Sequence, residues 1–193
     1  MILLDRDFGM EVVNDYHSPS NIYGFVLYTE VHPYVRKVMR DKDFWDEFDV
    51  KSGANWPIFS VKELENKKNS SYNRLACEFF NLKNADEDLP CMIIFALDEK
   101  EKEIAFQRTY KIKGKTVDEV HQSILSVIES VADVEKVIRD NNDKGIETTP
   151  FVAWEASKSI DKLEIKDCVR DGFYGIGKLS TLIYLLGKLL VKA

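Results

Sequence analysis

The chain has 193 residues, of which 45% are hydrophobic, and a formal net charge of -6. This length and proportion are enough for one folded domain with a packed core, which argues against a disordered protein. The acidic surplus argues against nucleic acid as a partner, because binding a phosphate backbone requires concentrated Lys and Arg. The three cysteines, Cys77, Cys91 and Cys168, are an odd number without close spacing. They predict a reducing, cytoplasmic compartment and no disulfide framework.

The sequence predicts neither a membrane-spanning helix nor a leader. No segment reaches the roughly 18 to 20 uncharged apolar residues that a spanning helix requires. The first residues contain Asp5, Asp7 and Glu11 and lack the basic flank and long apolar run of a signal peptide. We therefore expect an unprocessed chain.

The first half of the chain predicts two strands and two helices. Residues 22–28 (IYGFVLY) are β-branched and aromatic, as in a buried strand. A helix is expected to begin at Pro33, to carry apolar side chains at helical spacing and to end at Ser52. Residues 56–61 (WPIFSV) predict the second strand, and residues 75–82 carry the apolar stripe of the second helix.

The second half predicts a strand pair followed by a long helix. Residues 91–97 (CMIIFAL) are the most strand-like run in the chain. Residues 104–112 alternate apolar and polar side chains, so the two segments are expected to form an antiparallel pair joined by a charged turn. Thr116 and Glu119 have the spacing of a capping box at the start of the third helix.

The order of these elements resembles the thioredoxin-like fold. Strand, helix, strand, helix, strand, strand and helix follow one another over residues 22–137, and Leu89-Pro90 stands directly before the third strand. The resemblance implies an α/β fold with a mixed sheet and flanking helices. It also implies that the peptide bond before Pro90 is cis and that Pro90 borders a substrate groove. A generic α/β sandwich is the alternative fold.

We divide the chain into three parts on this basis. Residues 1–21 are an N-terminal extension, residues 22–140 the thioredoxin-like domain, and residues 141–193 a C-terminal extension. Within the last part we expect a loop near residues 148–150 and a short helix around Trp154.

The chain lacks the chemistry of the redox members of that superfamily. A thiol-disulfide oxidoreductase carries Cys-x-x-Cys where the first strand meets the first helix, whereas residues 29–34 here read Thr-Glu-Val-His-Pro-Tyr. Dithiol exchange needs one thiolate to attack and a second thiol to resolve the mixed disulfide. These side chains therefore exclude the ordinary redox activity.

Three residues near residues 29–34, the place of Cys-x-x-Cys in the redox members, are candidate catalytic groups. Cys91 follows Pro90, and His32 with Glu30 has the composition of an acid-base pair. A structural role is the alternative for each, because a cysteine that opens a buried strand acts as a small hydrophobe and a His before a helix caps it or faces solvent. No spacing of His, Cys, Asp and Glu predicts a metal, and no phosphate loop predicts a cofactor.

Tyr34, Trp45, Trp56 and Pro90 are the candidate binding residues. Trp45 and Trp56 stand on either side of the junction between the first helix and the second strand. Aromatic side chains at such a junction either seal the core or line a groove for a peptide or partner. Tyr34 and Pro90 lie where the resemblance implies a groove.

Residues 172–193 depart most from the average composition. They contain three lysines and no acid and are otherwise almost continuously apolar. A helical wheel groups Lys178, Lys188 and Lys192 on one side. An amphipathic, largely apolar helix of this kind must bury its apolar surface. We expect it to dock on its own domain, to pair with another chain or to lie on an anionic membrane surface.

We interpret the chain as a non-catalytic thioredoxin-like binding or protein-interaction module of the cytoplasm. Its partner is expected to be another protein or a second copy of itself. One alternative is an enzyme that uses single-thiol or acid-base chemistry at the vacated active site. The other is a membrane-surface effector that acts through residues 172–193.

Overall fold

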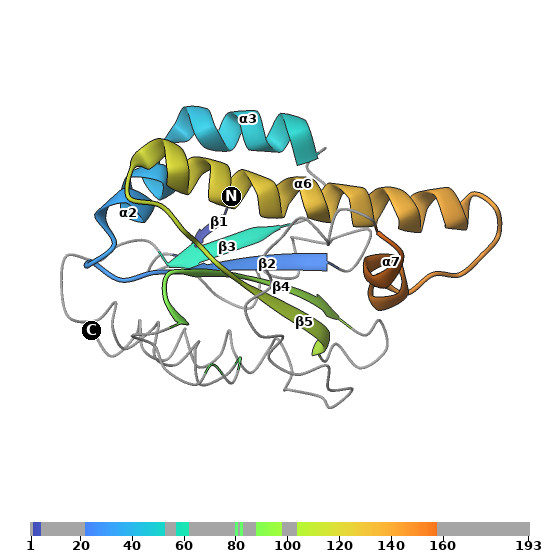
Figure 1. Ribbon diagram of the computed structural model, residues 1–193. Coiled ribbons are helices and arrows are strands. Elements are labelled where there is room, and N and C mark those ends of the chain that lie inside the picture. The colour runs from blue at the N-terminus through green and yellow to red at the C-terminus, as the bar shows by residue number, and fades with distance from the viewer. Residues whose placement is uncertain are drawn as a thin grey trace.

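The structure, a computed structural model, describes residues 2–4, 22–52, 57–61, 80, 82, 88–97 and 104–157. Its elements, in chain order, are β1 (Ile2–Leu4), β2 (Ile22–Leu27), α2 (Pro33–Arg40), α3 (Lys42–Ser52), β3 (Ile58–Val61), β4 (Cys91–Leu97), β5 (Ile104–Lys111), α6 (Val117–Asn142) and α7 (Pro150–Ala156). The strands form one five-stranded sheet, and α2, α3 and α6 lie over one of its faces (Figure 1). The predicted α/β class is therefore confirmed.

The sheet is mixed, with the strand order β1-β3-β2-β4-β5. β3 is parallel to β1 and to β2, while β4 runs antiparallel to both β2 and β5. The antiparallel pair expected from residues 91–97 and 104–112 is confirmed by a register that sets Met92 opposite Tyr110. β1 forms one edge of the sheet, although the sequence placed it in an extension that precedes the domain.

The two central strands, β2 and β4, are buried on both faces of the sheet. On one face, Val26, Met92 and Ile94 belong to the hydrophobic core that α6 helps to build. On the other face aromatic rings stack, and the ring centroids of Tyr23 and Phe95 lie 5.6 Å apart. Burial on both sides requires apolar side chains at successive positions, which explains why both strands read as continuous apolar runs.

The prediction of a single helix between Pro33 and Ser52 is wrong, because the chain breaks at Asp41 into two helices, α2 and α3. Asp41 has an extended backbone, with φ -78° and ψ 106°. Its Oδ1 accepts hydrogen bonds from the N–H groups of Asp43 at 3.1 Å and Phe44 at 3.3 Å. These are the bonds of an N-cap, so Asp41 ends α2 and caps the beginning of α3.

α6 begins where the sequence predicted. The Thr116 side chain accepts a hydrogen bond from the Glu119 N–H at 3.2 Å, which confirms the predicted cap. The Glu119 carboxylate accepts from the Lys115 N–H at 2.6 Å instead of from the N–H of Thr116. The buried apolar residues of α6 are Val120, Ile124, Val127, Ile128, Val131, Val134 and Ile138.

The short helix expected around Trp154 is confirmed as α7. Thr149 caps it, and its side chain accepts a hydrogen bond from the backbone of the first turn. Trp154 is buried, and its ring centroid lies 5.4 Å from that of Phe106 in β5. Arg108 of β5 donates to the Glu155 carboxylate at 2.7 Å, so α7 is held to the sheet by both an aromatic contact and an ion pair.

Two predicted helices lie outside the described residues. One is the helix over residues 75–82, apart from Phe80 and Leu82, which are described and buried. The other is the apolar C-terminal helix within residues 172–193. None of the helices in the described ranges has the length and apolar content needed to cross a membrane.

We expect the replacement Asp41→Ala to lower the free energy of unfolding by about 1 kcal/mol, because two N–H groups at the start of α3 lose their acceptor. Asp46→Ala is the matched control, since Asp46 is an exposed aspartate on the same helix. Chemical denaturation followed by circular dichroism measures both variants. Equal losses in the two would contradict the capping role of Asp41.

Candidate functional site

The loop that joins β2 to α2 lies at one end of the sheet, beside the residues that precede β4 (Figure 1). β2 and β4 are antiparallel neighbours with Leu27 opposite Cys91, so the chain that leaves β2 meets the chain that enters β4. The Leu89-Pro90 peptide bond there is cis, as the resemblance implied. The Pro90 carbonyl oxygen accepts a hydrogen bond from the Ile112 N–H at 2.9 Å, which brings the end of β5 to the same place.

Lys111, the last residue of β5, lies between these two segments. Its Nζ donates to the Leu89 carbonyl oxygen at 2.5 Å. It is also near enough to His32 for its positive charge to lower the pKa of the imidazole. Lys111 was not predicted as a site residue, because its partners are distant along the chain and a cation at the end of a strand is a weak signal.

His32 is held by the backbone of its own loop. The Thr29 N–H donates to His32 Nδ1 at 3.1 Å. Nδ1 must then carry a lone pair, so the neutral ring holds its proton on Nε2. The His32 N–H donates in turn to the Thr29 carbonyl oxygen at 3.0 Å, which closes a turn immediately before Pro33, the first residue of α2.

The His32 imidazole is neutral at neutral pH. Partial burial of the ring lowers its pKa from the ordinary value of 6.5, and the charge of Lys111 lowers it further, whereas the hydrogen bond with the Thr29 backbone acts in the opposite direction. Burial is the largest of these effects, so the net shift is downward. The ring therefore acts first as a structural part of the loop.

The structure does not bring the three candidate catalytic residues together. Glu30 is exposed, and no hydrogen bond joins it to His32 in the part of the chain that the structure describes. Cys91 is 0% exposed at the start of β4, so its thiol is shielded from solvent. Among the described residues, no three His, Cys, Asp or Glu side chains are grouped so that they could hold a metal ion. This arrangement favours structural roles for Cys91 and His32.

Apolar side chains are exposed on this loop and in the first turn of α2. Val31 is 75% exposed and Tyr34 is 41% exposed, and Pro33 between them is exposed as well. We call these three side chains, together with the neighbouring Pro90, the loop surface. Tyr34 and Pro90 were predicted as binding residues, whereas Val31 was missed, although an apolar residue between two polar ones is a visible signal.

Trp45, one of the two tryptophans predicted to bind a partner, lies in the core. Its ring centroid is 4.8 Å from that of Phe44 and 5.5 Å from that of Phe48, and its side chain is buried. The Phe44 ring also meets His121 of α6 edge-on, at 4.4 Å. These contacts correspond to the packing alternative, because they seal the junction of α3 with α6. The other tryptophan, Trp56, is outside the described residues.

Comparison of the whole chain with family models, with curated proteins and with solved structures found no match. The function must therefore be inferred from the residues themselves. The loop surface combines exposed apolar side chains with a loop whose hydrogen bonds are defined, and it lies beside Pro90.

We expect the stability of the protein to fall below about pH 6.5 in part because of His32. The pKa of the folded ring is lowered, so the unfolded ring takes up a proton first as the pH falls, and the unfolded state gains stability until the folded pKa is passed. The replacement His32→Asn keeps an acceptor for the Thr29 N–H and removes the titration.

The measurement is the free energy of unfolding of the natural chain and of His32→Asn between neutral and mildly acidic pH. The variant should lose less stability over this range than the natural chain does, because its other titrating groups are the same. Parallel pH profiles for the two proteins would show that the environment of His32 does not shift its pKa.

Proposed function

We propose that this chain is a non-catalytic thioredoxin-like module that binds a peptide segment of a partner protein on the loop surface. The fold part of the proposal is supported by the order of the described elements, which follows the order from which the resemblance was drawn. It is also supported by the antiparallel neighbours β2 and β4, since their pairing sets residues 29–34 beside Leu89 and Pro90. The helix expected over residues 75–82 lies outside the described residues, apart from Phe80 and Leu82.

The absence of redox catalysis is supported by the positions of the thiols. Residues 29–34 contain no cysteine, although this is where the first strand meets the first helix. Cys91 is the one cysteine within the described ranges, and its burial keeps it from attacking a disulfide in solution. The exposed apolar side chains of the loop surface, at this end of the sheet, are suited to binding another protein.

The observation that carries the proposal is the exposure of Val31 on a hydrogen-bonded loop and of Tyr34 in the first turn of the helix that follows it. A large apolar side chain in water is an unfavourable arrangement that contact with a partner relieves, at about 25 cal/mol for each Å² removed from water. Tyrosine is frequent among the residues that contribute most to binding, because its ring buries a large area while its hydroxyl stays hydrogen-bonded. The hydrogen bonds between Thr29 and His32 hold the loop, which lowers the entropy lost on binding.

The two other functions expected from the sequence find no specific support in the described residues. An acid-base enzyme would need Glu30 and His32 to act together, and they share no hydrogen bond. A membrane-surface effector would act through residues 172–193, which lie outside the described residues. Binding of a partner protein is therefore the function that we propose.

The double replacement Val31→Ser with Tyr34→Ser should weaken peptide binding and leave the fold intact, because both side chains are exposed. Peptides selected from a phage-displayed library of random dodecamers on the full-length protein supply the probe, and fluorescence anisotropy measures their affinity. We expect a loss of about tenfold or more, the scale of one binding hot spot. Val50→Ser is the control, because Val50 is 83% exposed on α3, outside the loop surface.

Selected peptides that bind the double variant as tightly as the natural chain would place recognition elsewhere on the molecule. Failure to select any peptide would contradict peptide binding itself. A circular dichroism melting curve of each variant shows whether the fold has been retained.

We expect the protein to leave the rate of insulin reduction by dithiothreitol unchanged. No thiol occupies residues 29–34, so no mixed disulfide forms and resolves there. Turbidity of precipitating insulin B chain measures the rate, with thioredoxin as the positive control. A faster rate that disappears in the variant Cys91→Ser would contradict the non-catalytic proposal and return the single-thiol enzyme to consideration.

A further inference from the structure

The loop surface lies at a basic end of an acidic protein. Residues 31–40 contain three Lys or Arg residues and no acid, and residues 109–117 contain three Lys or Arg residues and no acid. The formal charge of the whole chain is -6, so the acidic surplus belongs to the other residues. Acids border both segments, with Glu30 and Asp41 on either side of the first and Asp118 and Glu119 after the second. The six cations are Arg36, Lys37, Arg40, Lys111, Lys113 and Lys115.

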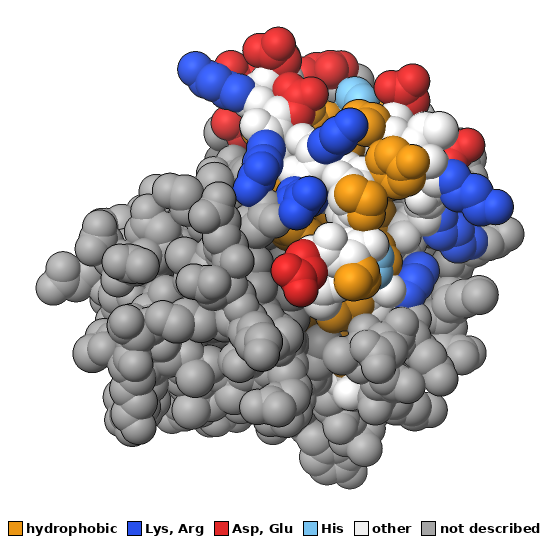
Figure 2. All heavy atoms as spheres, turned by 90° about the vertical axis from the view of Figure 1, so that its left-hand side faces the viewer, with side chains coloured by type: hydrophobic (Ala, Val, Ile, Leu, Met, Phe, Trp, Pro, Cys, Tyr) orange, Lys and Arg blue, Asp and Glu red, His pale blue; other side chains and the backbone are white. Residues whose placement is uncertain are grey.

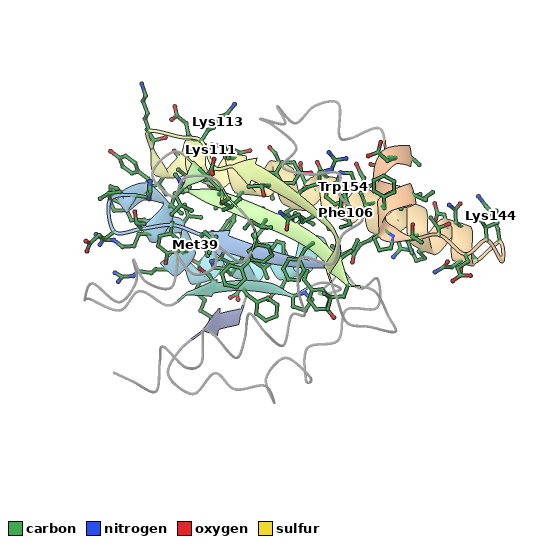
Figure 3. The ribbon with its side chains drawn as sticks, turned by 90° about the horizontal axis from the view of Figure 1, so that it is seen from below. Met39, Phe106, Lys111, Lys113, Lys144 and Trp154 are labelled. Carbon is green, nitrogen blue, oxygen red and sulfur yellow. The ribbon has the colours of Figure 1, made fainter. Side chains whose placement is uncertain are left out.

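The fold brings these two basic segments together. Lys111 interacts with the ring of His32 and donates to the carbonyl oxygen of Leu89, so the end of β5 lies against the β2–α2 loop. The chain then continues through Lys113 into the start of α6, and α6 packs against α2. Figure 3 shows Lys111 and Lys113 at the end of the sheet where α2 lies, whereas Lys144 lies at the far end of α6.

Apolar and basic side chains therefore share one face of the molecule. Figure 2 shows hydrophobic side chains lying between Lys and Arg side chains on this face, while Asp and Glu side chains gather mainly towards the top, at the height of α3. On α2, Tyr34 and Lys37 are three residues apart and both are exposed, so they are neighbours on one side of the helix. A bound segment that contacts Tyr34 also comes within reach of the Lys37 ammonium.

We propose that the partner of the loop surface is an acidic peptide segment with a central apolar side chain. This inference rests on the proposed function and specifies its ligand. The apolar side chain would cover Val31 and Tyr34, and the flanking carboxylates would face the cations of α2 and of residues 111–115. Glu30 is exposed and directly precedes Val31, so the acidic flanks of the peptide are expected to avoid the Glu30 carboxylate.

Charge complementarity favours a short acidic peptide over a nucleic acid. A phosphate backbone is a long polyanion, so it would extend from this basic end towards parts of the protein that carry the acidic surplus. A peptide with a few carboxylates contacts the basic end alone. It also supplies the apolar side chain that Val31 and Tyr34 require and that a phosphate backbone lacks.

The test compares three fluorescent dodecapeptides that share a central Leu-Phe pair. Their flanks are Asp and Glu in the first, Ser and Gly in the second, and Lys in the third. Fluorescence anisotropy with the full-length protein should give an affinity for the acidic peptide about tenfold higher than for the neutral one, and the Lys-flanked peptide should bind weakest. High salt should remove most of the difference, because it screens surface charges.

The double variant Lys37→Glu with Lys113→Glu should weaken binding of the acidic peptide by about tenfold, because two attractions become repulsions. Lys136→Glu with Lys144→Glu is the matched control, since it changes the net charge equally, at Lys136 of α6 and at Lys144 just after the end of α6, away from the loop surface. This control should leave the affinity within about twofold of the natural value.

The outcomes separate the inference from the function on which it rests. Equal affinities for the acidic and neutral peptides, unchanged by salt, would overturn the acidic ligand and leave peptide binding in place. Failure of all three peptides and of the library-selected peptides would overturn both. Tighter binding of single-stranded oligothymidine than of the acidic peptide would overturn the inference in favour of a nucleic-acid partner.

Discussion

The arrangement of this protein depends on the antiparallel pairing of β2 with β4. The register that sets Leu27 opposite Cys91 decides that the loop after β2 and the residues before β4 meet at one end of the sheet. A slip of one residue would turn every side chain of these strands to the opposite face of the sheet. Both faces are buried, but they pack against different side chains, so the slipped strands would fit neither core. One face packs on aliphatic residues of α6, and the other stacks the rings of Tyr23 and Phe95.

The same pairing explains why one end of the sheet gathers unlike side chains. Val31 of the loop after β2 and Tyr34 in the first turn of α2 are exposed, and the Thr29 N–H donates to the His32 ring between them. The end of β5 adds Lys111, whose ammonium is bonded to the carbonyl of Leu89. Apolar contact and fixed geometry thus come from residues 29–34, whereas the positive charge comes from the end of β5.

Local signals allowed much of the fold to be predicted. The continuous apolar run of residues 91–97 and the Thr116 cap are written in neighbouring residues, so β4 and the start of α6 follow from the sequence. The break at Asp41 was missed because apolar side chains continue at helical spacing across it, and the carboxylate that caps α3 resembles any other exposed acid. The contact of Lys111 with the Leu89 carbonyl spans distant residues, which periodicity cannot reveal. The strands and helices that position the site could therefore be predicted from the sequence, whereas the position of Lys111 beside it could not.

The ion pair between β5 and α7 has a consequence for local unfolding. Arg108 projects from β5, is buried and is bound to Glu155 of α7. Detaching α7 would leave a buried guanidinium without this counter-ion and would also separate the rings of Trp154 and Phe106. We therefore expect α7 to unfold together with the sheet and not ahead of it.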